Sequence, residues 1–252
     1  MSVWAGRPLV VGHRGGRGPG WPPENTMRAF ERARAEGARA IELDVRAGAD
    51  GSCFVFHDDT LARMTEAAGG GDERAVDGLD GAARAAVDLG SGARIPTLVE
   101  VLDWARAADI AVNVEMKHGT AQRRALVRGT LAAVRSSAAD VLLSSFDPVL
   151  LALAAVRGPD VPRALLTHRG QAAWAAVLQQ AVRAPLVEAV HIERTQAVAH
   201  DLGRYAARGV RLGAWTVNDP IEARDLVRRG VATIITDRPG EMLAALRDVT
   251  RT

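Results

Sequence analysis

Short apolar runs alternate with longer amphipathic segments along the whole chain. The apolar runs are rich in Val, Ile and Leu, whereas Ala, Leu and Arg recur between them at helical spacing. The runs at 141–143 and 233–235 are too continuously apolar for a sheet with one wet face, so they predict strands buried on both faces. The pattern predicts eight strands, at 9–12, 40–45, 110–117, 141–145, 163–167, 186–192, 210–217 and 231–236.

The segments between the strands predict helices with recognisable ends. Asn25 and Thr26 offer a cap for the first helix, Gly37 ends it, and the pair Asp219-Pro220 begins a later one. Strands and helices that alternate in this way are typical of parallel βα units. We expect a closed (β/α)8 TIM barrel, with an open doubly wound sheet as the alternative. The predicted helices are 27–36, 98–108, 121–138, 148–156, 171–182, 196–208, 219–229 and 240–248.

One segment interrupts the alternation after the second strand. Residues 52–57 predict an extra short strand, and residues 66–95 are rich in Gly, Ala and Asp before helix signals resume at Pro96-Thr97. We interpret about 58–95 as a small insertion over the mouth of the barrel. Nothing along the chain reads as a linker, so residues 1–252 are expected to form a single domain.

Composition narrows the environment and the partners. The 32 basic and 30 acidic residues are interspersed along the helical segments, which argues against nucleic-acid binding. Cys53 is the only cysteine, so it is expected to be a buried strand residue in a chain without intrachain disulfides. With neither a signal-peptide pattern nor an apolar stretch of membrane-spanning length, we expect a cytoplasmic protein that does not insert stably into membranes; homo-oligomer formation is left open.

A glycine-rich turn follows the first strand and raises the question of nucleotide binding. The turn reads Gly-His-Arg-Gly-Gly-Arg-Gly over residues 12–18, with His13 and Arg14 in place of the Lys-Ser/Thr of a phosphate-binding loop. An intact dinucleotide fingerprint is also missing. The turn therefore predicts close approach of the backbone to a phosphate beside His13 and Arg14, without a nucleotide cradle.

Charged residues gather at the predicted carboxyl ends of the strands, where active sites of parallel barrels lie. Residues two apart on a strand project to the same side, so Glu42 and Asp44 point together, as do Glu115 and Lys117. Three carboxylates crowded there need a counter-charge, and a hard divalent cation such as Mg²⁺ or Ca²⁺ supplies it. The alternative is a buried salt-bridge network with Arg14 and Lys117.

Two histidines end strands that face the same opening. His13 follows the first strand and His57 follows the extra short strand. A histidine pair beside a metal-bound phosphate supplies an acid and a base near neutral pH, as phosphodiester cleavage requires. The other four histidines, at 118, 168, 191 and 200, are expected on the surface or in loops.

Together these motifs resemble the glycerophosphodiester phosphodiesterase family, and they occur in the family's order over essentially the whole chain. They include His-Arg-Gly-Gly at 13–16, Pro-Glu-Asn-Thr at 23–26, Ile-Glu-Leu-Asp-Val at 41–45, His-Asp at 57–58, Asn-Val-Glu-Met-Lys at 113–117, Ser-Phe at 145–146, Ala-Trp-Thr-Val-Asn at 214–218 and Thr-Asp-Arg-Pro at 236–239. Each motif is weak alone, but the ordered set is specific.

The resemblance implies a TIM-barrel phosphoric diester hydrolase that converts glycerophosphodiesters to sn-glycerol 3-phosphate and an alcohol, with one divalent cation, Mg²⁺ or Ca²⁺. It assigns roles to ten residues of this sequence. These are His13 and His57 as the acid/base pair, Glu42, Asp44 and Glu115 as metal ligands, Arg14 and Lys117 as phosphate-binding residues, Trp215 as a wall of the substrate pocket, and Glu24 and Asn25 as residues that either shape the loop or contact the substrate.

One departure from the family pattern leaves the leaving-group side of the pocket open. The family often has Asn-Pro or His-Pro after the sixth strand, whereas this chain has Val-His-Ile-Glu-Arg-Thr at 190–195. The alternatives are a lysophospholipase D or phosphoinositide-type phosphodiesterase, which needs an apolar trough for a lipid, and a non-catalytic barrel that only binds its ligand.

Overall fold

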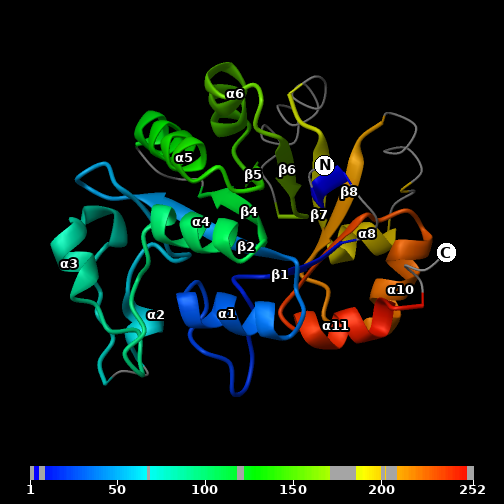
Figure 1. The fold of residues 1–252 in the computed structure, drawn as a ribbon, viewed down its shortest axis with the longest axis horizontal. Coiled ribbons are helices and arrows are strands. Elements are labelled where there is room, and N and C mark those ends of the chain that lie inside the picture. The colour runs from blue at the N-terminus through cyan, green and yellow to red at the C-terminus, as the bar shows by residue number, and fades with distance from the viewer. Residues whose placement is uncertain are drawn as a thin grey trace.

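Eight parallel strands close into a barrel in the computed structural model, which describes residues 3–5, 9–66, 69–117, 122–170, 186–199, 202 and 209–248 (Figure 1). Pairing between the first and second strands completes the ring, so the prediction of a TIM barrel is confirmed and the open-sheet alternative is excluded. The strands, in spatial order, are β1 (Leu9–Gly12), β9 (Thr233–Thr236), β8 (Arg211–Trp215), β7 (Ala189–Glu193), β6 (Arg163–Thr167), β5 (Val141–Ser145), β4 (Ala111–Met116) and β2 (Ala40–Ala47).

Helices surround the barrel and cover its apolar outer face (Figure 1). Their ends match the predicted caps: Thr26 accepts a hydrogen bond from the Ala29 N–H, and Asp219 caps a helix whose first residue is Pro220. The helix predicted at 171–182 lies outside the described residues. The helices are α1 (Met27–Ala35), α4 (Leu98–Ala107), α5 (Arg123–Ser137), α6 (Pro148–Arg157), α8 (Arg194–Ala199), α10 (Pro220–Arg228) and α11 (Pro239–Leu246).

The segment after β2 forms a small lobe beside the barrel. It begins with the predicted extra strand, β3 (Cys53–Val55), which pairs antiparallel with β2, and continues through α2 (Ala62–Thr65), η3 (Val76–Gly78) and α3 (Gly81–Ala85). The lobe has an apolar core of its own, and buried Arg46 of β2 joins it by ion pairs to Asp59 and Asp77. None of the described residues in 58–95 lines the main cavity, and α2 and α3 lie beside the barrel in Figure 1.

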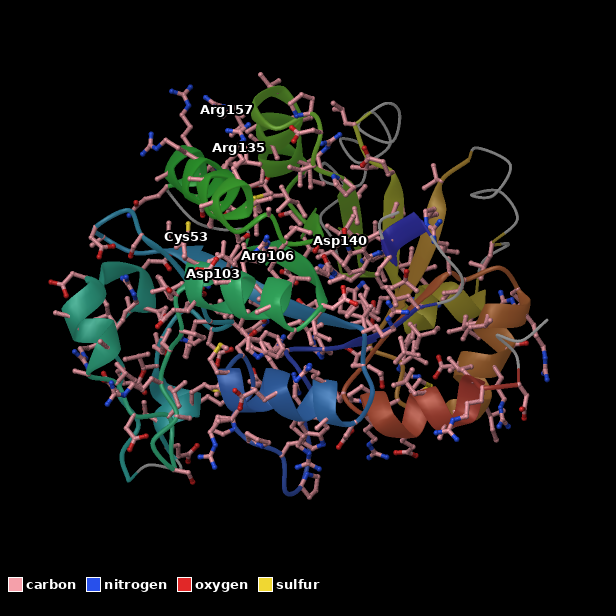
Figure 2. All side chains as sticks on the ribbon, in the orientation of Figure 1. Cys53, Asp103, Arg106, Arg135, Asp140 and Arg157 are labelled. Atoms are coloured by element: carbon pink, nitrogen blue, oxygen red, sulfur yellow. The ribbon has the colours of Figure 1, made fainter. Side chains whose placement is uncertain are left out.

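The amino end of the barrel is closed by the first residues of the chain. The short helix η1 (Val3–Ala5) places Trp4 against apolar side chains from the barrel interior. Asp140, which is labelled in Figure 2, accepts a hydrogen bond from the Val3 N–H at 2.8 Å. Cys53 is buried in β3, as predicted. With this end filled, the barrel interior opens toward the carboxyl ends of its strands.

His191 corrects the expectation of a surface or loop histidine. It lies on β7 with 1% of its surface exposed. Its ring occupies space left by Gly213 on the neighbouring strand β8, where an added Cβ would come within 2.4 Å of the ring. Burial lowers the pKa of His191 to about 4, so the ring is uncharged near neutral pH. The imidazole therefore fills space in the interior of the barrel.

This packing predicts a strong coupling between His191 and Gly213. Gly213→Ala should destabilise the fold by about 1–3 kcal/mol through overpacking. His191→Ala removes the obstructing ring, so the double variant should be more stable than the sum of the two single changes predicts. Urea unfolding of the four proteins measures the coupling. Simple additivity would show that the two side chains do not compete for the same space.

Candidate active site

A cavity of about 310 Å³ opens at the carboxyl ends of the barrel strands. This is where active sites of TIM barrels lie, because the loops after the strands meet there. Predicted site residues His13, Arg14, Glu42, His57, Glu115, Lys117 and Trp215 line the cavity, together with Asn113, Ser144, Phe146, Leu166, His168, Glu193 and Ile235.

Three carboxylates meet at one side of the cavity. Glu42 and Asp44 alternate along β2 and so face the barrel interior together, while Glu115 lies on the adjacent strand β4, in register with Asp44. One oxygen from each carboxylate lies within 4.8 Å of the other two. This spacing suits three ligands of a single ion.

Two cationic side chains partly balance the three carboxylates. Lys117 Nζ lies 3.0 Å from Glu115 and 3.3 Å from Asp44. The Arg14 Nε lies 3.1 Å from Asp44. Glu42 is paired with neither side chain and instead accepts a hydrogen bond from the backbone N–H of Arg14 at 3.0 Å. The predicted salt-bridge alternative thus accounts for Asp44 and Glu115 and leaves Glu42 without a cation.

The pKa values of the two β2 carboxyls move in opposite directions. Burial, and then the charges of Asp44 and Glu115, hold the pKa of Glu42 well above its ordinary range. Burial alone would also raise the pKa of Asp44, but Lys117 and Arg14 hold it well below the ordinary range. Two neighbouring carboxyls with such different environments mark a site that is short of positive charge.

The loop after β1 holds Arg14 and Asn25 against this cluster. Both residues have left-handed backbone conformations, with φ of 52° and 58°. The turn carries the Arg14 side chain to Glu24 at 2.7 Å and the Asn25 amide to Asp44 at 2.8 Å. Glu24 also pairs with Arg63 of the small lobe. Neither Glu24 nor Asn25 lines the cavity, and their side chains contact Arg14, Arg63 and Asp44.

His13 is oriented by a carboxylate from the opposite end of the sequence. Its Nδ1 lies 2.7 Å from Asp237, which also accepts a hydrogen bond from the Asn218 amide at 2.8 Å. With Nδ1–H donated to Asp237, Nε2 is the nitrogen available in the cavity, 3.9 Å from Glu42. Burial lowers the pKa of His13, and the bond to Asp237 opposes this effect only in part.

His57, which also lines the cavity, has an equivalent partner. Its Nδ1 lies 2.6 Å from Asp58, which is in turn held by Arg63 at 2.6 Å. The two predicted histidines therefore share one arrangement, in which a carboxylate fixes Nδ1 and leaves Nε2 for a ligand. The sequence placed Asp237 and Asp58 next to strand ends, but nothing in their spacing identified the histidine that each orients.

The opposite half of the cavity is aromatic. Phe146 packs edge to face against Trp215 at 5.4 Å and against His168 at 5.3 Å between ring centroids. Glu193, at the end of β7 and in register with Trp215, also lines this half. The sequence predicted Trp215 at this site but not Phe146, His168 or Glu193. The signals that could have identified these residues were the Ser-Phe motif and the departure from the family pattern at 190–195.

The floor of the cavity carries polar groups without protein partners. The side-chain amide of Asn113 and the hydroxyl of Ser144 are 1% and 0% exposed, and neither forms a hydrogen bond within the described part of the chain. Buried polar atoms left unpaired cost about 1–3 kcal/mol each. A ligand hydroxyl or ordered water in the cavity would satisfy them.

The site lies at the carboxyl ends of the strands, which is where TIM-barrel enzymes carry out catalysis. The glycerophosphoryl diester phosphodiesterase family model matches residues 13–241, and the chain belongs to this family of phosphoric diester hydrolases.

Individual relatives are similar to this chain over nearly their full lengths. A glycerophosphodiester phosphodiesterase of Caldanaerobacter subterraneus is 29% identical over 245 residues, which cover 95% of this chain and 98% of the relative. The structure of an Oleispira antarctica phosphodiesterase in complex with the product sn-glycerol-3-phosphate has a TM-score of 0.82 and 25% identity, covering 98% of this chain and 100% of that chain. A glycerophosphodiester phosphodiesterase from Thermotoga maritima has a TM-score of 0.74 and 25% identity, with 95% and 98% covered.

The charge imbalance predicts a trade between stability and ion binding at Glu42. A carboxyl whose pKa is raised in the folded state takes up a proton on folding, so it lowers stability progressively as pH rises above the unfolded-state value. In chelator, Glu42→Gln should therefore raise the thermal unfolding midpoint by about 2–4 °C at pH 8 and have little effect near pH 4. Added Mg²⁺ or Ca²⁺ should stabilise the wild type more than this variant.

Differential scanning fluorimetry across this pH range measures the effect. Glu241→Gln is a matched control, because Glu241 is a half-exposed carboxylate of α11 that pairs with Arg238. A Glu42→Gln midpoint that is lower than the wild-type value at pH 8, or a difference that is the same at every pH, would contradict the account.

Proposed function

We propose that this protein hydrolyses glycerophosphodiesters to sn-glycerol 3-phosphate and an alcohol, using one divalent cation, Mg²⁺ or Ca²⁺. The observation that carries the proposal is the group formed by Glu42, Asp44 and Glu115, whose oxygens lie within 4.8 Å of one another. Glu42 and Glu115 line the same cavity as His13 and His57. The family of the chain supports the reaction, and the hard oxygen ligands support the choice of ion.

The three carboxylates fit a divalent ion because the protein's own cations leave their charge unbalanced. Among the described residues, the basic side chain paired with Glu42 at the shortest distance is His13 at 3.9 Å, and burial together with the charges of Asp44 and Glu115 raises the pKa of Glu42. When bound, a divalent cation polarises a phosphoryl oxygen and lowers the pKa of a hydroxyl or water. Glu42, Asp44 and Glu115 would hold it.

The basic side chains bind and orient the phosphodiester. Arg14 and Lys117 line the cavity beside the carboxylates, so their N–H groups can bind the phosphoryl oxygens that gain charge in the transition state. Asn113 and Ser144 offer buried partners to the hydroxyl groups of glycerol. These contacts place the part of the substrate that leaves as the alcohol in the aromatic half of the cavity.

The histidine pair transfers the protons. Nε2 of one histidine takes a proton from the nucleophile, and Nε2 of the other gives a proton to the departing alkoxide oxygen. Asp237 and Asp58 keep each Nδ1–H in place, so both rings present Nε2 to the substrate. Each transfer contributes about 10²- to 10⁴-fold to the rate.

A small diester suits this cavity better than a lipid does. A lysophospholipid needs an apolar trough or a membrane-docking surface, and the described part of the small lobe lies beside the cavity and does not extend it. Within the described ranges, no helix combines the length and hydropathy needed to cross a bilayer. Comparison of glycerophosphocholine with lysophosphatidylcholine as substrates distinguishes the two classes.

The histidine assignment predicts a nearly complete loss of activity in two variants. His13→Ala and His57→Ala should each lower the turnover number for glycerophosphocholine by at least about 10²-fold, because one proton transfer is lost. Asp58→Asn should have a smaller effect, since the ring remains. Release of sn-glycerol 3-phosphate in a coupled assay gives the rates, and thermal unfolding verifies the fold. Turnover near the wild-type level in either alanine variant would refute the assignment.

The metal assignment predicts a weaker response to added ion in Glu115→Gln. Removal of one of three anionic ligands should shift the activating concentration of Mg²⁺ or Ca²⁺ upward by about 10-fold or more. Titration of chelator-treated protein, read both by product release and by calorimetry of ion binding, measures the shift. An unchanged binding isotherm would remove Glu115 from the ligand set.

A further inference from the structure

The cavity has two chemically distinct halves. Its basic groups, His13, Arg14, His57 and Lys117, come from the segments after β1, β3 and β4 and lie on the side of the cavity that Glu42 and Glu115 also line. The half formed by β5 to β8 contributes Phe146, Leu166, His168, Glu193 and Trp215. The second half contains aromatic rings and one acidic side chain, and none of its described lining residues is a lysine or an arginine.

Glu193 is held in place without being neutralised. Its Oε2 accepts a hydrogen bond from the backbone N–H of Arg169 at 3.0 Å. The Arg169 guanidinium itself bonds to the carbonyl of Thr195 at 3.1 Å. Among the described residues, Glu193 forms no ion pair with a lysine or arginine side chain. A backbone donor fixes the carboxylate, while its charge remains available to the cavity.

The rings beside Glu193 are held by hydrogen bonds and ring contacts. Trp215 donates its indole N–H to the carbonyl of His191 at 3.1 Å, and Phe146 packs edge to face against it. His168 accepts a hydrogen bond at Nδ1 from the Gly170 N–H at 3.1 Å. Electron-rich ring faces around a carboxylate attract an organic cation.

We propose that Glu193, Phe146 and Trp215 form a subsite for a quaternary ammonium group on the leaving alcohol, as in a choline ester. This inference rests on the proposed function and specifies its substrate class. A trimethylammonium has no N–H groups to donate, so it depends on ring faces and a nearby negative charge, both of which this half supplies. An anionic head group would face Glu193 and is disfavoured.

The most direct test compares two esters of the same shape. Glycerophosphocholine and glycerophospho-3,3-dimethylbutanol differ only in the nitrogen or carbon at the branched centre, and hence in one positive charge. Wild-type protein should prefer the choline ester by about 10-fold in kcat/KM. Glu193→Gln keeps the bond from the Arg169 N–H but removes the charge, so it should bring the two esters to within about 3-fold.

One further variant tests the role of the tryptophan ring, and another controls for general effects. Trp215→Leu keeps apolar bulk and should lower kcat/KM for the choline ester more than for the neutral ester, because the ring face is lost. Glu241→Gln removes a carboxylate on α11 that does not line the cavity and should leave the preference unchanged.

The outcomes separate this inference from the proposed function. If wild-type protein hydrolyses both esters with no preference for choline, the subsite assignment is overturned and the hydrolase remains. If Glu193→Gln slows both esters equally, Glu193 acts on the part that they share, which also overturns it. If neither ester releases sn-glycerol 3-phosphate with Mg²⁺ or Ca²⁺ present, the proposed function itself fails.

Discussion

The site depends on an imbalance of charge at the mouth of the barrel. Three buried carboxylates meet there, whereas Lys117 and Arg14 pair with only two of them and leave Glu42 without a cationic partner. Burial and the neighbouring carboxylates therefore raise the pKa of Glu42. Unbalanced charge of this kind is common at functional sites, and it is the basis on which we propose that a divalent cation binds here.

The barrel imposes this imbalance through backbone geometry. The pleat of β2 points Glu42 and Asp44 the same way, and its register with β4 brings Glu115 alongside Asp44. The strands are packed on their outer faces by helices, and Trp4 fills the amino end, so the charged groups cannot turn away from one another. Close-packed surroundings restrict the movement of the cluster, as a preorganised site requires.

Much of the fold and of the candidate site could be predicted from the sequence, since periodicity determines which residues share a face. All eight predicted barrel strands are present, and the predicted acids and His13 lie together. Contacts between distant segments were beyond this reasoning: the bond from His13 to Asp237 spans 224 positions. The burial of His191 also escaped prediction, because it depends on the absence of a side chain at Gly213 on the next strand.

The aromatic half of the cavity shows the same limit, since Phe146, Trp215 and Glu193 meet only when three separate strand ends are brought together. Capture of a divalent ion by these uncompensated carboxylates can be observed by anomalous X-ray diffraction from crystals soaked in Mn²⁺. We expect one strong anomalous peak within bonding distance of oxygens of Glu42, Asp44 and Glu115. Full-occupancy manganese elsewhere, with this cluster still closed by Lys117 and Arg14 alone, would contradict it.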